Sequence, residues 1–144
     1  MATLKPTTGF AAIPQKLRLI LDSIRFEHTI FALPFAYLGM VLAADGLPTL
    51  PQFIWITVAM ASARTLAMSA NRIIDRQLDA ENPRTASRPL PAGRLKLWEM
   101  TAMSTISLAI FLFAAAMLNT MTLILAPVAV VVGGGYPYTK RFTW

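Results

Sequence analysis

Three oxygen-bearing side chains recur at intervals of four residues near the middle of the chain: Asn71, Asp75 and Asp79. A spacing of four turns each side chain about 40° from the last in an α-helix, so the three share one face. Arg64 lies two turns before Asn71 and falls on the same face. Carboxylate and amide oxygens are hard ligands, and Mg²⁺ usually joins protein carboxylates to substrate phosphates. This polar stripe predicts a magnesium–phosphate site.

Two features of the stripe admit a simpler interpretation. Asp75 and Asp79 could pair with Arg72 and Arg76 on an exposed helix end, because such one-turn pairs are common. Arg64 interrupts the apolar run FIWITVAMASARTLAMSA. A charge in mid-bilayer costs at least about 2.5–3.5 kcal/mol, so such a side chain normally faces a cavity or a partner. The simpler interpretation is that Arg64 pairs with an acidic side chain and serves packing alone.

The segment after the stripe, ENPRTASRPLPAGR at residues 81–94, favours the site. Its prolines and glycine end the helix and stiffen the loop. Its three arginines, at positions 84, 88 and 94, carry planar donors suited to phosphate. Contact with anionic lipid would explain the charge but not the density of proline.

The elements that must position these residues are four apolar blocks, at residues 29–44, 53–70, 97–118 and 121–132. We expect the second block to continue as a polar helix to about Ala80, and an amphipathic stretch at 15–27 to lie at the interface or to start the first helix. Only 14% of the 144 residues are charged, against about 25% in soluble domains. The sequence therefore predicts an all-α, polytopic transmembrane bundle of about four spans in a lipid bilayer.

Basic residues precede the first block, fill the segment between the second and third, and follow the fourth. The other two connections, at 45–51 and 119–120, contain none. This alternation places the amino terminus and the site on the cytoplasmic side of the cell (inner) membrane. The net charge of +6 lies beside apolar runs, so we expect no nucleic-acid partner. The absence of cysteine excludes disulfides and thiolate metal sites.

The string NRIIDRQLDAENPRTASRPLPAGR resembles the first aspartate-rich motif and following loop of the UbiA family of intramembrane prenyltransferases. That motif reads Asn-x-x-x-Asp-x-x-x-Asp, then Arg-Thr-x-x-Arg-Pro-Leu-Pro-x-Gly. YPYTKRFTW, at 136–144, resembles the family's Tyr-Pro-x-x-Lys-Arg-x-Thr segment. The resemblance covers about residues 16–144, and Arg72 stands where the family more commonly has aspartate.

Family members have roughly nine helices, about twice this length, and a second aspartate-rich motif in the later half. The resemblance therefore implies that residues 15–144 form the first half of the family's transmembrane domain, behind a flexible tail at 1–14. It also implies that the chain is an amino-terminal fragment that is inactive alone.

The resemblance further implies transfer of a polyprenyl group from an allylic polyprenyl diphosphate to an aromatic acid acceptor. Asn71, Asp75 and Asp79 would bind Mg²⁺ on the diphosphate, and Arg64 would hold an acceptor carboxylate or a diphosphate oxygen. The diphosphate-binding positions would be Asn71, Arg88, Lys140 and Arg141.

The commonest acceptor for this pattern is 4-hydroxybenzoate, in ubiquinone biosynthesis. A naphthoate acceptor in a menaquinone route is the near alternative. Two other classes stay open: a non-catalytic membrane fragment, and an anion-transport subunit that uses Arg64 as its anion site.

Overall fold

A computed structural model describes residues 12–25 and 27–139, which form six helices and contain no strand. The helices are α1 (Ala12–Ser23), α2 (Glu27–Ala44), α3 (Leu50–Ile74), α4 (Arg76–Glu81), α5 (Leu97–Leu118) and α6 (Thr120–Thr139). The all-α prediction is confirmed. Residues 1–11 of the predicted tail lie outside the described residues, and α1 begins at Ala12.

Four of these helices, α2, α3, α5 and α6, are long and apolar enough to cross a bilayer. The shortest, α2, has 18 residues, or about 27 Å at 1.5 Å per residue, close to the ~30 Å hydrocarbon core. Large apolar side chains point outward along them, among them Phe31, Phe35 and Val131, each more than 70% exposed. Such side chains suit lipid, and the predicted four spans are confirmed.

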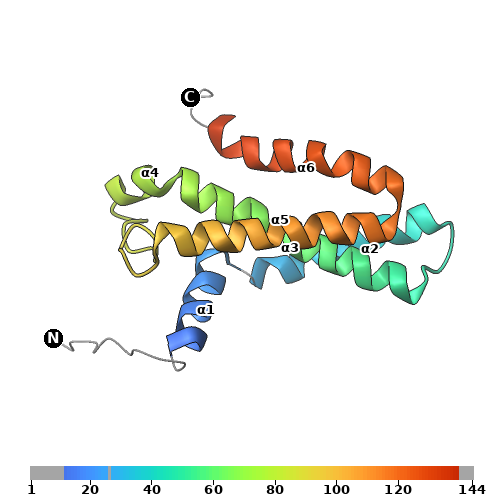
Figure 1. The fold of residues 1–144 in the computed structure, drawn as a ribbon, viewed down its shortest axis with the longest axis horizontal. Helices are drawn as coiled ribbons and strands as arrows, with labels where there is room; N and C mark the ends of the chain where they lie inside the picture. Colours follow the sequence, from blue (N-terminus) through green and yellow to red (C-terminus); the bar gives the residue numbers. More distant parts are fainter. Residues whose placement is uncertain (1–11, 26, 140–144) are drawn as a thin grey trace.

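The central helix of the bundle is α3. It packs along most of α5 and also contacts α2 and α6. Figure 1 shows α3, α5 and α6 running along the long axis of the molecule, while α1 runs across that axis at the end where α4 lies. The other three long helices and α4 thus all contact α3, the helix that carries Arg64 and Asn71.

The amphipathic stretch forms a separate helix, α1, and does not start the first span. Arg25 turns the chain between α1 and α2 with a left-handed φ of 49°. Next to it, Ile24 is buried in a cluster with Leu95 and Met100. This cluster holds the end of α1 against the loop and the start of α5.

Two helix boundaries differ from the sequence expectation. The predicted continuous helix to Ala80 ends at Ile74, because Asp75 takes a φ of −84° and a ψ of 1° before α4 begins. Aspartate has a low propensity for helix interiors, because its side chain hydrogen-bonds to nearby backbone groups in caps and turns. The fourth span, in contrast, continues through Gly133–Gly135 to Thr139 without a break. A Cβ at Gly133 would lie 4.0 Å from that of Ala67, so α6 approaches α3 closely here.

Candidate functional site

The backbone keeps the one-turn steps of the polar stripe even across the break at Asp75. The Asp75 amide donates to the Asn71 carbonyl at 2.9 Å, and the Asp79 amide donates to the Asp75 carbonyl at 2.8 Å. Consecutive i to i+4 bonds of this kind stack the three residues one turn above another. The spacing read from the sequence is therefore present as geometry.

Two members of the stack retain unused oxygens. Asn71 is half-buried, and its Oδ1 atom is buried without a hydrogen-bond partner. Asp75 is also half-buried and forms no ion pair within 4.0 Å with another described residue. A buried polar atom without a partner costs about 1–3 kcal/mol. A cation at the stack would relieve that cost.

The third member, Asp79, is only 8% exposed. The Nη1 atom of Arg88 donates to both of its carboxylate oxygens at 2.7 Å. The Nη1 atom of Arg72 lies 3.8 Å from Oδ2 of the same carboxylate. Two guanidinium groups therefore compensate the buried charge of Asp79.

The loop after α4 brings Arg88 back over Asp79. The amides of Arg84 and Thr85 bond to the side chain and carbonyl of Asn82 at 3.0 and 2.9 Å, which forms a tight turn. The Thr85 hydroxyl then donates to the Asp79 carbonyl at 2.9 Å. Thr85 was not singled out from the sequence, although it belongs to the Arg-Thr pair of the motif.

Arg64 lies in the middle of α3, about 10 Å along the axis from Asn71. Its side chain is half-buried, and its Nε atom is buried without a hydrogen-bond partner. No described carboxylate lies within 4.0 Å of it, so the packing pair that the sequence left open is not found among the described residues. A guanidinium group at this depth is available for an anionic ligand.

Arg72 is the main residue that the sequence analysis missed. It is only 7% exposed, and its Nε donates to the carbonyl of Ser23 at 2.9 Å. It reaches Asp79 seven positions later and not through a one-turn pair, while Arg76 is exposed. The sequence analysis named Arg72 only as a possible one-turn partner of an acid and as a departure from the UbiA motif.

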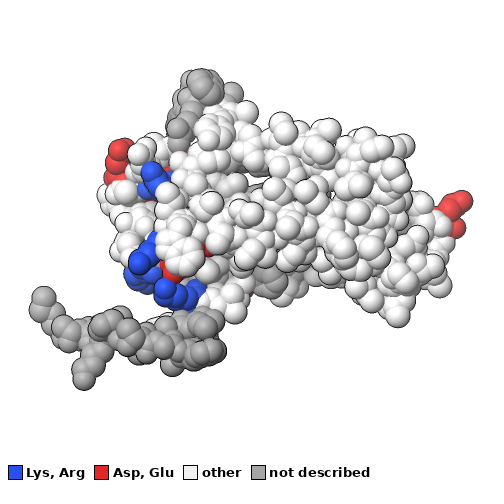
Figure 2. Space-filling model, viewed as in Figure 1, with Lys and Arg blue, Asp and Glu red and all other residues white. Residues whose placement is uncertain are grey.

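The remaining predicted site residues, Lys140 and Arg141, lie outside the described residues. Figure 2 shows the basic side chains gathered at the end of the molecule where α4 and its loop lie, with an uncharged shaft beyond them on this face. The stack therefore lies at the basic end of the bundle.

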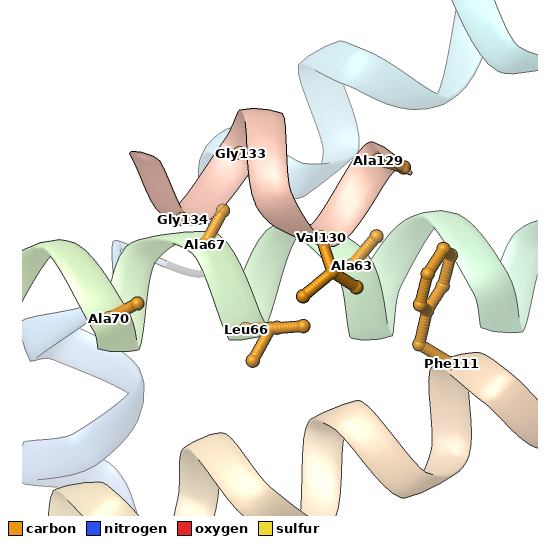
Figure 3. Close-up of a pocket in the computed structure, with 9 residues that line it drawn as sticks. All are labelled: Ala63, Leu66, Ala67, Ala70, Phe111, Ala129, Val130, Gly133 and Gly134. Atoms are coloured by element: carbon orange, nitrogen blue, oxygen red, sulfur yellow. The ribbon is translucent and has the colours of Figure 1, made fainter. Parts of the chain in front are cut away.

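A small apolar cavity of about 110 Å³ lies between α3, α5 and α6 (Figure 3). Ala63 and Ala70 line it, and each comes one position before a stripe residue, Arg64 or Asn71. One position turns the helix by about 100°, so the cavity is on the neighbouring face of α3. Its size is below the ~300 Å³ of ordinary ligand pockets, so it fits only part of an apolar chain.

Residues 32–144 match the UbiA prenyltransferase family. The chain belongs to this family. It is 36% identical over 137 residues to a 4-hydroxybenzoate octaprenyltransferase of Paraburkholderia phytofirmans, covering 92% of this chain and 46% of that protein. A protein of the same name from Burkholderia cenocepacia is 37% identical over 102 residues, which are 70% of this chain and 35% of the relative. The chain thus spans about half the length of these curated relatives or less.

Two solved structures agree with the fold. The apo structure of a UbiA homolog from Aeropyrum pernix K1 is 41% identical and has a TM-score of 0.76, covering 81% of this chain and 42% of the other. A structure of digeranylgeranylglyceryl phosphate synthase in membranes, 24% identical, matches with a TM-score of 0.79 over 88% of this chain and 45% of that one. With its four apolar spans, this UbiA chain is an integral membrane protein.

The donor set fits a magnesium ion shared with a diphosphate. The described residues contain no group of three His, Cys, Asp or Glu side chains that could enclose a metal. Mg²⁺ does not need such a cage, because it keeps waters and takes one or two carboxylates plus substrate phosphates. Asp75 and the unused Asn71 Oδ1 supply that smaller set, beside Asp79, whose two oxygens are held by Arg88.

Proposed function

We propose that this chain contributes one half of a prenyltransferase site that joins a polyprenyl group to 4-hydroxybenzoate in ubiquinone biosynthesis. The reaction class is supported by membership of the UbiA prenyltransferase family. The acceptor is supported by the names of the relatives from Paraburkholderia and Burkholderia. The observation that carries the proposal is the stack of Asn71, Asp75 and Asp79, with its buried unpartnered oxygen, at the basic end of α3.

In this proposal the stack binds the diphosphate of an allylic polyprenyl diphosphate through Mg²⁺. The metal would supply charge neutralisation that lets the diphosphate leave. Asn71, Asp75 and Asp79 would hold the ion in place. Arg88, Lys140 and Arg141 would donate to diphosphate oxygens, whose negative charge grows as the allylic carbon–oxygen bond breaks.

The acceptor then supplies the electrons for the new bond. An electron-rich ring carbon of 4-hydroxybenzoate attacks the allylic carbon, and the ring loses a proton to restore aromaticity. Arg64 has no described anionic partner, so it suits the acceptor carboxylate or a diphosphate oxygen. The cavity between α3, α5 and α6 suits part of the apolar prenyl chain.

We place the site on the cytoplasmic side of the cell (inner) membrane, with the amino terminus inside. The basic end of the bundle supports this orientation through the positive-inside rule. We further propose that residues 15–144 form the first half of the catalytic domain and that residues 1–144 alone do not complete the reaction. The length of the relatives supports that division.

The experiment measures transfer of a polyprenyl group to labelled 4-hydroxybenzoate in membranes that contain the natural gene product, including any sequence that follows residue 144. We expect activity with Mg²⁺, none with a chelator, and at least a 100-fold loss in Asp75→Asn, since even supporting residues of metal sites cost 10–100-fold. Asp45→Asn, in the connection with no basic residue, is the matched control. Normal transfer by Asp75→Asn would contradict the metal assignment.

A further inference from the structure

Arg72 holds an unusual position beside the stack, and the proposed function gives it no task. It is nearly fully buried at the end of α3, where a guanidinium group must be compensated on several sides. Its Nε atom donates to the last carbonyl of α1, at Ser23, at 2.9 Å. Its Nη1 atom lies 3.8 Å from Asp79. One planar group thus joins the end of α1 to a carboxylate of the stack.

The anchor on α1 is buried and well packed. Ser23 is only 5% exposed, and the next residue, Ile24, is 2% exposed within the cluster that contains Leu95 and Met100. At the start of α1, Lys16 pairs with Glu99 of α5 at 2.6 Å. A carbonyl fixed in this way holds the guanidinium plane of Arg72, because the five donors of arginine form a rigid fork.

The second arginine at Asp79 has a different kind of support. Arg88 belongs to the loop between α4 and α5, is about one-third exposed, and takes both oxygens of Asp79 with a single nitrogen. A metal ion at the stack would compete with Arg88 for those oxygens, and a diphosphate would compete with Asp79 for the Arg88 guanidinium. Arg72 approaches Asp79 from the buried side and is bonded to Ser23. It can therefore stay beside Asp79 when the hydrogen bonds from Arg88 break.

We propose that Arg72 is a positioning residue, which orients the Asp79 carboxylate for the metal by tying it to the end of α1. The inference rests on the proposed function, because it takes Asp79 as a metal ligand. It also gives α1 a role in the site, because the Ser23 carbonyl of this helix holds Arg72, and Arg72 in turn orients the Asp79 carboxylate. Arg72 itself touches neither metal nor substrate.

A purely electrostatic role for Arg72 predicts the opposite sign. Asp79, Asp75, Arg88 and Arg25 are the charged groups that act on Arg72. If Arg72 only added positive charge near the stack, its removal would strengthen cation binding. If it positions Asp79, its removal weakens cation binding, by about 10–100-fold for a residue that supports a metal ligand.

The experiment measures Mn²⁺ affinity, from the EPR signal of the protein-bound ion, in the natural gene product in lipid nanodiscs. Geranyl diphosphate is present at one fixed concentration and no acceptor is added. We expect Arg72→Gln to weaken Mn²⁺ binding by about 10–100-fold. Arg72→Lys keeps the positive charge but loses the planar fork that can contact two partners at once. Its Mn²⁺ affinity should therefore lie between those of the wild-type protein and Arg72→Gln.

One control variant separates positioning from the loss of a nearby positive charge. Arg76→Gln removes an exposed positive charge four residues away, and its Mn²⁺ affinity should stay within about 2-fold of the wild-type value, since separate sites act independently. An equal loss in Arg76→Gln would overturn the inference, as would unchanged or tighter Mn²⁺ binding in Arg72→Gln.

Other outcomes are also decisive. If Arg72→Gln does not fold, Arg72→Lys decides, and wild-type affinity in that variant would overturn the inference. If the unsubstituted protein binds no Mn²⁺, the metal site of the proposed function fails first and the role of Arg72 fails with it. That result is distinguishable from normal binding that Arg72→Gln leaves unchanged.

Discussion

The two ends of α3 are built in different ways. At its start the Thr49 amide donates to the side chain of Gln52 at 2.9 Å, an exposed contact between residues three positions apart. At its other end Arg72 bonds to Ser23, 49 positions away, and just beyond that end Asp79 of α4 is held by Arg88 from the following loop. The first end satisfies its polar groups locally. The second depends on tertiary structure and leaves the buried Asn71 Oδ1 without a partner.

This difference shows that the end of α3 where Arg72 lies carries a desolvation cost that the start of α3 does not. Capping a helix with nearby side chains needs no other element. Gathering charged side chains from α3, α4 and a loop in a partly buried region costs desolvation that packing alone does not require. A region assembled at such a cost, with donor and acceptor atoms left unused, is where a charged ligand would bind.

The largest expected effect comes from Asp79→Asn, just beyond the end of α3 where Arg72 lies. The substitution leaves Arg72 and Arg88 without their anion, and breaking a buried pair from one side costs about 3–5 kcal/mol. We expect the free energy of unfolding, measured by titration with denaturing detergent, to fall by about 3 kcal/mol. Prenyl transfer should also be lost.

The control for that prediction is Asp45→Asn, in the exposed connection before α3. Asp45 has a φ of 51°, which asparagine tolerates. We expect a change within about 0.5 kcal/mol. Equal destabilisation by the two substitutions would remove the contrast between the ends.

Arg64→Leu should separate binding from stability. Loss of a hydrogen bond to a charged ligand is worth about 1.5–3 kcal/mol, so the KM for acceptor or diphosphate should rise by about 10–100-fold. Stability should be unchanged or higher, because a charge leaves the middle of a span. Steady-state kinetics and detergent unfolding test both parts, and an unchanged KM for both substrates would be inconsistent with a ligand at Arg64.

Glu99→Gln should loosen α1 modestly. It removes the ion pair with Lys16, whose side chain is 52% exposed, so the expected loss is about 1 kcal/mol. Faster hydrogen exchange in α1 would report the change. A double-substitution cycle with Lys16→Gln should show that the two effects are not additive, and full additivity would show that the pair contributes nothing.

The smallest effect should come from Gln52→Ala at the start of α3. This change removes one exposed hydrogen bond to the Thr49 amide and should cost about 0.5 kcal/mol. Prenyl transfer should stay at the wild-type rate. A large loss of prenyl transfer would mean that the start of α3 also takes part in the site.

The parts of the fold that follow from local pattern could be predicted from the sequence. The third apolar block was expected at 97–118 and α5 spans Leu97–Leu118, because hydropathy decides where a span begins and ends. The stack was predicted because a spacing of four depends on helical geometry alone. The break at Asp75 did not disturb it, since the backbone bonds on either side persist.

The parts that depend on tertiary contacts could not be predicted. Arg72 was expected, at most, to pair with an acid one turn away, and nothing in the local pattern points to a carbonyl of α1. The closing of Arg88 onto Asp79 depends on the turn around Asn82, whose direction is set by the packed loop. The roles of Asn71, Asp75, Asp79, Arg64 and Arg88 stay predictions.

The central claim is that Asp75 binds the metal that carries the diphosphate. The 144 residues contain no cysteine, so Asp75→Cys introduces a unique thiolate here, a ligand that favours softer ions over Mg²⁺. The account predicts that prenyl transfer by this variant is lost with Mg²⁺ and returns when Cd²⁺ is added, while Glu81→Cys, at an exposed position on α4, works normally with Mg²⁺. A normal rate for Asp75→Cys with Mg²⁺ alone would contradict it.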